Sequence, residues 1–254
     1  MISGQAELLG DRYLFSGKVL PHLRAWMEAQ VGLDITRTSP PQPQMKAIPP
    51  PFSNGVPRNQ AFFEQIKNHC LDMSFDDEDR LFHSHGHTCQ EIYMLRYGSF
   101  NRIPDVVVYP GCHEHVEAIV KAATEHNVVI IPFGGGTSVS YALMCPEDEK
   151  RIIVSLDMHR MNKIKWVNNK SMLACVEAGI IGKDLEEKLG LYGFCTGHEP
   201  DSMEFSSLGG WVATRASGMK KNKYGNIEDI LVKVKFVTPR GKICPLPPSP
   251  LSDD

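Results

Sequence analysis

The 254-residue sequence predicts an α+β fold, in which strands and helices do not alternate regularly. Residues 104–132 have the pattern of a strand, a helix and a second strand. Beyond residue 150, short strands dominate and must pair with one another. Three consecutive glycines, Gly134 to Gly136, directly follow the second strand, and ligand loops of such folds lie at strand ends.

The composition of the whole chain narrows the class of protein. A net charge of -3 argues against a general nucleic-acid binder, which would carry a basic surface. The longest apolar runs are shorter than the ~20 residues that span a bilayer. Seven cysteines without a Cys-x-x-Cys pair favour reduced thiols in an intracellular protein. No secretory signal opens the chain, and its last residues are not the Ser-Lys-Leu peroxisomal address.

Residues 1–100 are expected to form a mostly helical N-terminal region. A helix from Leu20 to Val31 carries an apolar stripe, in which Trp26 should pack into a core. Residues 39–58 are rich in proline and predict an extended linker. Two further helices are expected around Phe62 and Ile92.

Alternating histidines lie between these two helices, at His83, His85 and His87. Such spacing raises the alternative of a metal site, but no cysteine or carboxylate pattern of a zinc centre surrounds it. Charge pairing and loop hydrogen bonds are the preferred interpretation, and no metal site is predicted.

Residues 101–244 are expected to form one domain, followed by a disordered proline-rich tail over 245–254. A strand between Pro104 and Pro110 leads to a helix that begins near His113. The expected elements beyond the glycine loop are strands at 152–156, 164–167 and 173–179 and a helix at 182–190.

The glycine loop predicts a pyrophosphate-binding site. Without Cβ atoms, the backbone amides of Gly134 to Thr137 can converge on an anion as a nest of N–H donors. Thr137 and Ser138 add hydroxyl groups. The loop matches neither the P-loop nor the Rossmann pattern, so a flexible turn between core segments remains the alternative.

A second glycine-rich stretch covers residues 193–229. Gly209-Gly210 opens a helical turn of small residues, against which a large flat group can lie. Lys220, Lys221 and Lys223 follow and can neutralise an anion, although a solvated basic loop is the simpler explanation for lysines alone.

Three motifs give the chain a family resemblance: Gly134 to Tyr141, Cys195 to Ser202 and Thr214 to Asn222. Together they resemble the PCMH-type FAD-binding domain of the vanillyl-alcohol-oxidase family. Within that family the chain is similar to the alkylglycerone-phosphate synthases of ether-lipid biosynthesis. The resemblance covers most of residues 4–241 and implies non-covalent FAD. The implied cofactor-binding residues are Pro132, Phe133, Gly134, Gly135, Gly136, Thr137, Ser138, Asp201, Ser202, Met203, Glu204, Phe205, Ser206, Ser207, Thr214, Arg215, Ala216 and Ser217.

The resemblance also implies an FAD-dependent transferase. The reaction would exchange the acyl chain of acyl-dihydroxyacetone phosphate for a fatty alcohol, in a peroxisome, with peripheral membrane contact and a homodimer as further expectations. The family's catalytic cap domain follows this region, so the chain is expected to be truncated and no catalytic residue is named. The alternatives are an FAD-linked 2-hydroxy-acid oxidoreductase and an inactive FAD-binding or interaction fragment.

Overall fold

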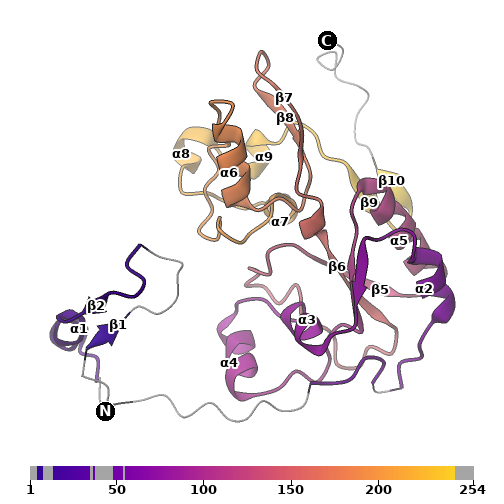
Figure 1. Ribbon diagram of the computed structural model, residues 1–254, viewed down its shortest axis with the longest axis horizontal. Helices are drawn as coiled ribbons and strands as arrows, with labels where there is room; N and C mark the ends of the chain where they lie inside the picture. Colours follow the sequence, from indigo (N-terminus) through magenta and orange to yellow (C-terminus); the bar gives the residue numbers. More distant parts are fainter. Residues whose placement is uncertain (1–4, 8–13, 35–36, 38–47, 54, 244–254) are drawn as a thin grey trace. The chain divides into compact units, whose positions relative to one another are not determined.

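The computed structural model describes residues 5–7, 14–34, 37, 48–53 and 55–243 (Figure 1). The chain divides into two compact units, Met1–Gln44 and Met45–Asp254. The predicted tail at 245–254 and residues 39–47 of the predicted linker lie outside the described residues. The predicted division into domains near residue 100 stays a prediction.

Among the described residues of the first unit are two short paired strands and one helix. Strand β1 (Ala6–Glu7) pairs antiparallel with β2 (Val19–Leu20), and α1 covers Leu23–Val31. The helix confirms the one predicted at 20–31, although it begins three residues later. The prediction that Trp26 packs into a core is wrong, because α1 has no buried residue and Trp26 is 57% exposed. Amphipathic spacing predicts a helix but not the surface that covers it.

The second unit is built around a four-stranded sheet with the order β3-β4-β6-β5. Strands β4 (Val106–Tyr109), β6 (Ile153–Asp157) and β5 (Val129–Phe133) are parallel. The edge strand β3 (Asp72–Ser74) is antiparallel to β4. The predicted strand–helix–strand is therefore a crossover, and β6 inserts between its two strands. β3 was not predicted, because three residues without periodicity carry no strand signal.

Two helices pack with this sheet, α5 (His113–Glu125) and α2 (Gln60–Ile66) (Figure 1). The core between these helices and the sheet is apolar. Each fully buried large apolar side chain contributes about 1.5–3 kcal/mol to the free energy of unfolding. All five residues of β6 are buried, as expected for a central parallel strand. The most deeply buried side chains of this core are Phe62, Ile66, Val106, Val108, Ile119, Ala122 and Val154.

Two short helices, α3 (Asp77–Phe82) and α4 (Cys89–Tyr97), follow β3 in the sequence. The Asp76 side chain caps α3 by accepting from the N–H groups of Glu78 and Asp79. Thr88 caps α4, and Glu91 completes a capping box with it. The helix predicted around Ile92 is thereby confirmed.

A second core gathers elements from residue 164 onward. The hairpin of β7 (Ile164–Asn168) and β8 (Leu173–Val176) and helix α6 (Gly182–Gly190) were all predicted and are confirmed. Helix α7 (Leu208–Thr214) confirms the predicted helical turn of small residues. The buried side chains of this core are Ile180, Leu185, Leu189, Trp211 and Ile227.

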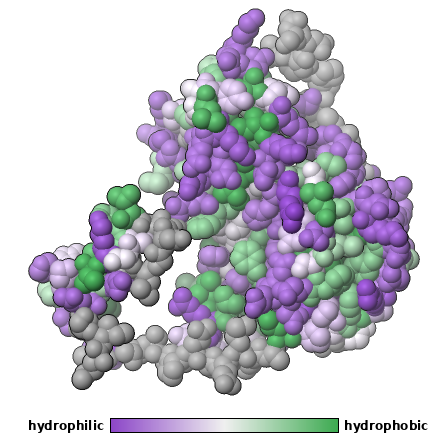
Figure 2. All heavy atoms as spheres, viewed as in Figure 1, coloured by the Kyte–Doolittle hydropathy of each residue, from purple (hydrophilic) through white to green (hydrophobic). Residues whose placement is uncertain are grey.

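Several short elements were not predicted, namely the 3-10 helix η1 (Met158–Arg160), α8 (Lys221–Tyr224), α9 (Ile227–Ile230) and the hairpin of β9 (Phe236–Thr238) with β10 (Gly241–Ile243). The mixture of locally paired strands with helices confirms the predicted α+β class. Figure 2 shows hydrophilic side chains over much of the visible surface, interrupted by small apolar patches. None of the described helices is both long enough and apolar enough to cross a membrane.

Candidate FAD-binding site

The glycine loop leaves the sheet where two parallel strands end together. Phe133, the last residue of β5, lies opposite Asp157, the last residue of β6. Residues 134–138 follow at once and are half-buried. In the described part of the chain, no hydrogen bond uses the backbone N–H of Gly134, Gly135, Gly136 or Thr137 as its donor. These four donors are therefore available to a ligand.

The second predicted segment packs directly against this loop. A Cβ atom on Gly135 would lie 1.7 Å from the carbonyl oxygen of Phe205, and one on Gly134 would lie 2.2 Å from Ser207 Oγ. At Gly135 the clash is with backbone atoms, so glycine is required there, whereas at Gly134 a side chain would have to displace the Ser207 hydroxyl. The structure thus brings residues 132–138 and 201–207 together.

Residues 201–207 are fixed by their own hydrogen bonds. The N–H groups of Phe205 and Ser206 both donate to the carbonyl of Ser202, at 2.9 and 2.8 Å. The Trp211 indole N–H donates to Ser206 Oγ at 2.7 Å, and Trp211 is 2% exposed. Ser207 is the N-cap of α7, and its side chain accepts from the N–H of Gly210. The segment is therefore held between the glycine loop and the second core.

The third predicted segment, residues 214–217, lies at the opposite end of α7. This helix has seven residues, which places its two ends about 10 Å apart. Arg215 ends the helix in a left-handed conformation (φ 51°), and its guanidinium forms an ion pair of 2.8 Å with Glu228. Thr214 Oγ1 donates to the carbonyl of Gly210. Among the described residues, no hydrogen bond or ion pair joins this segment to the glycine loop.

His198 is a candidate site residue that was not predicted from the sequence. It is fully buried with its ring edge-on to Trp211, at a centroid distance of 5.0 Å. Neither ring nitrogen has a hydrogen-bond partner among the described residues. Burial lowers the pKa of His198, which keeps the imidazole neutral near pH 7. A buried polar group without a partner is a candidate ligand contact.

Phe133 is one of the predicted cofactor-binding residues, but its side chain points into the protein interior and packs under the glycine loop. The ring is 1% exposed and lies 4.2 Å, between centroids, from the ring of His83. Gly136 has a positive φ of 66°, and a Cβ atom on it would lie 2.9 Å from the Phe133 ring. The ring therefore sets the position of Gly136.

The histidine-rich segment supplies buried polar contacts. His83 Nε2 lies 2.8 Å from Asp157 Oδ2, and Nδ1 lies 2.7 Å from the carbonyl oxygen of Asp79. His85 stacks on Phe100. The predicted loop hydrogen bonds are confirmed at His83, and charge pairing stays a prediction. Within the described ranges, no group of three or more His, Cys, Asp or Glu side chains is arranged to hold a metal ion.

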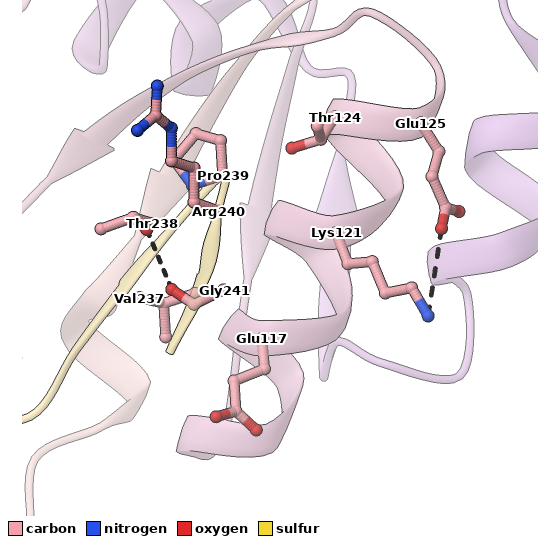
Figure 3. A pocket seen from close by; sticks show the side chains of 9 residues that line it. All are labelled: Glu117, Lys121, Thr124, Glu125, Val237, Thr238, Pro239, Arg240 and Gly241. Atoms are coloured by element: carbon pink, nitrogen blue, oxygen red, sulfur yellow. Dashed lines mark hydrogen bonds and ion pairs between the residues drawn. The ribbon is translucent and has the colours of Figure 1, made fainter. Parts of the chain in front are cut away.

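A separate pocket of about 420 Å³ lies between α5 and the β9–β10 turn (Figure 3). Its walls carry charges of both signs, including an ion pair of 3.9 Å between Lys121 and Glu125. None of the predicted site residues lines it. The lining residues are Glu117, Lys121, Thr124, Glu125, Val237, Thr238, Pro239, Arg240 and Gly241.

The chain matches a protein-family model and several curated relatives. Residues 104–246 match the family model described as "FAD binding domain". The chain is 44% identical over 247 residues to an alkyldihydroxyacetonephosphate synthase from Caenorhabditis elegans, which covers 96% of this chain and 41% of the relative. A synthase of the same name from Dictyostelium discoideum is 39% identical, with 88% of this chain and 37% of the relative covered.

A solved structure of an alkyldihydroxyacetonephosphate synthase superimposes with a TM-score of 0.82 at 38% identity. The alignment covers 90% of this chain and 43% of that structure. The chain thus spans about two fifths of the length of the curated relatives it matches.

Proposed function

Since the chain belongs to the family of PCMH-type FAD-binding domains, we propose that residues 132–138, 201–207 and 214–217 form its site for non-covalent FAD. FAD is the cofactor of this family, and the three segments account for different parts of it. The glycine loop would hold the pyrophosphate, and residues 201–207 and 214–217 would line the ribityl chain and the flavin.

One observation carries the proposal: four consecutive backbone N–H groups, from Gly134 to Thr137, have no acceptor within the described residues. Such adjacent donors are favourable for a pyrophosphate, whose oxygens accept several hydrogen bonds at once. Glycine at 135 is also required by the close approach of the Phe205 backbone. The residues present therefore fit the cofactor that the family implies.

An extended ligand explains the separation between the segments. The ends of α7 lie about 10 Å apart, a distance that an extended ligand such as a dinucleotide can span. The unpaired ring nitrogens of His198 lie beside Trp211 of the same helix. This buried imidazole is a further candidate contact for the bound ligand.

For the whole protein, the synthase relatives support an alkylglycerone-phosphate synthase activity. A fatty alcohol would replace the acyl chain of acyl-dihydroxyacetone phosphate, and the displaced acyl chain would leave as a fatty acid. When bound, the flavin supplies the electrophilic chemistry of this exchange. The described residues would bind and orient the cofactor and exclude water from it. None of them is assigned as a catalytic acid or base.

The proposed synthase activity also supports proposals on membrane contact, cellular location and oligomeric state. Apolar substrates support peripheral contact with a membrane surface, and the family relationship supports a peroxisomal location and a homodimer. The comparisons favour the synthase over a 2-hydroxy-acid oxidoreductase, because the synthases align over nearly the whole chain.

The cofactor site is tested at Thr137 by a pair of variants that differ only in charge. Asparagine and aspartate have nearly the same shape, so Thr137→Asn is the matched control for Thr137→Asp. A carboxylate a few ångströms from the pyrophosphate should weaken FAD binding by about tenfold or more. The measurement is an equilibrium titration of the 254-residue chain with FAD, followed by flavin fluorescence. Equal affinities of the two variants would refute the assignment of the glycine loop.

A further inference from the structure

A fully buried carboxylate, Glu91, lies outside the region that matches the FAD-binding domain. It sits in the first turn of α4 and accepts three hydrogen bonds. The donors are the N–H of Gly86 at 2.8 Å, the N–H of Thr88 at 3.1 Å and the hydroxyl of Thr88 at 2.7 Å. Glu91 thereby folds residues 86–88 into a fixed turn.

This turn contacts the glycine loop at Ser138. The backbone N–H of His87 donates to the carbonyl oxygen of Ser138 at 2.7 Å. Gly86 approaches the same oxygen so closely that a Cβ atom would lie 2.3 Å from it. A second link joins the neighbouring residues, since the Tyr141 hydroxyl donates to Gln90 Oε1 at 3.1 Å. The carboxyl end of the glycine loop is thus held by the start of α4.

Glu91 is both ionised and buried, which sets it apart from an ordinary helix-capping residue. Burial raises the pKa of its carboxyl, but the hydrogen bonds from Gly86 and Thr88 outweigh this effect and lower the pKa overall. Glu91 is therefore ionised at neutral pH. A buried carboxylate costs free energy unless its hydrogen bonds are well formed. A helix N-terminus can be capped by an exposed polar side chain, as Asp76 shows at α3. Full burial therefore points to a second role for this carboxylate.

We propose that Glu91 is a positioning residue for FAD binding, which acts by holding the 86–88 turn against Ser138 and so fixing the donors of the glycine loop. The inference rests on the proposed FAD site. It extends the cofactor-binding unit to residues 86–91, which precede the matched region 104–246.

Two variants disturb this contact in different ways. Glu91→Gln replaces one carboxylate oxygen with an NH2 group, which cannot accept from the donors that face it. Gly86→Ala leaves Glu91 in place and adds a Cβ atom that displaces the Ser138 carbonyl or the turn itself. The control for a lost helix cap is Asn59→Ala, since Asn59 accepts from the N–H of Phe62 at the start of α2. The control for an added methyl group is Gly190→Ala, where nothing lies within 4 Å.

FAD affinity and unfolding free energy are measured for these four variants and the wild-type chain, together with Thr137→Asp and Thr137→Asn. Both disturbing variants should lose FAD affinity by about tenfold, the lower end of the effect of groups that orient the ligands of a bound metal. Asn59→Ala should lose stability but keep its FAD affinity within about twofold, because the two sites are independent. Gly190→Ala should keep both.

The outcomes separate the two proposals. Wild-type affinity in a folded Glu91→Gln or Gly86→Ala variant would overturn the positioning role and leave the FAD site intact. Equal loss of affinity in Asn59→Ala would also overturn it, since general destabilisation would then explain the effect. Equal affinities of Thr137→Asp and Thr137→Asn would instead refute the FAD site itself.

Discussion

His83 and Asp157 are 74 residues apart in the sequence, yet their side chains meet in a hydrogen bond of 2.8 Å between Nε2 and Oδ2. Both residues are almost completely buried. Asp157 also lies 2.7 Å from the N–H and from the Nδ1 atom of His159. The His83 ring packs on Phe133, and Phe133 supports Gly136. The glycine loop therefore rests on a buried network of ionisable groups.

Replacement of Asp157 should remove an acid-sensitive part of the stability. Burial raises the pKa of its carboxyl, but hydrogen bonds from His159 and His83 outweigh this and lower it to about 2. The folded value lies below the ordinary 3.8, so this contribution is present above pH 3.8 and is lost as the pH falls through about 2.

Asp157→Asn should therefore cost about 3 kcal/mol at pH 7, the size expected when one partner of a buried pair is removed. Urea unfolding between pH 2 and pH 7 is the measurement. A variant whose stability falls as steeply with acid as that of the wild type would contradict this account.

His159 should act in the opposite pH direction. Its hydrogen bond to Asp157 raises the pKa of the imidazole above the ordinary 6.5. A raised pKa gives stability that is complete below pH 6.5 and is lost as the pH rises through the folded value. His159→Gln should lose less unfolding free energy between pH 6 and pH 9 than the wild-type chain does. Parallel curves for the two proteins would show that this bond does not stabilise the fold.

Two arginines offer a comparison of buried and exposed ion pairs. Arg102 pairs with Asp105 at 2.6 Å, and both side chains are at most 1% exposed. Arg102→Met should cost about 3–5 kcal/mol, because it leaves the Asp105 carboxylate buried without its cation. Arg215→Met should cost less than about 1 kcal/mol, because the Arg215 side chain is 76% exposed in its pair with Glu228. Chemical denaturation measures both, and similar losses would contradict the burial-based prediction.

Gly135 should tolerate no side chain. A methyl group there would overlap the carbonyl oxygen of Phe205, so Gly135→Ala should cost about 1–3 kcal/mol from overpacking. It should also weaken FAD binding, since the loop must move. Gly190→Ala is the matched control and should lose no unfolding free energy, because a Cβ atom there meets nothing within 4 Å and alanine is the better helix former at the end of α6. Unfolding and FAD titration of both variants check this, and a stable Gly135→Ala protein with normal FAD affinity would refute the required close approach.

Local patterns predicted the strands of the parallel sheet, α5 and the position of the glycine loop, because runs of β-branched apolar residues, helical spacing and consecutive glycines are visible in short windows. The same windows could not identify β3, which becomes a strand only by pairing with β4. Trp26 was misjudged because periodicity does not say what covers a face.

The sequence also did not predict the roles of Glu91 and His198 near the candidate site. Glu91 reads as a capping residue, and its contact with the glycine loop depends on a turn that meets Ser138 through the tertiary fold. His198 lies within the family motif Cys195 to Ser202, but the motif does not show that its ring is buried beside Trp211 with both nitrogens unpaired among the described residues. Contacts between residues far apart in the sequence produce no periodic pattern in the local sequence.

The central claim is that the backbone N–H groups of Gly134 to Thr137 bind the pyrophosphate of FAD. Hydrogen–deuterium exchange of these amides tests it directly, with and without saturating FAD. They have no acceptor among the described residues, so they should exchange rapidly in the free chain and become strongly protected when FAD is bound. Unchanged exchange at these four amides in a chain that has bound FAD would contradict the claim.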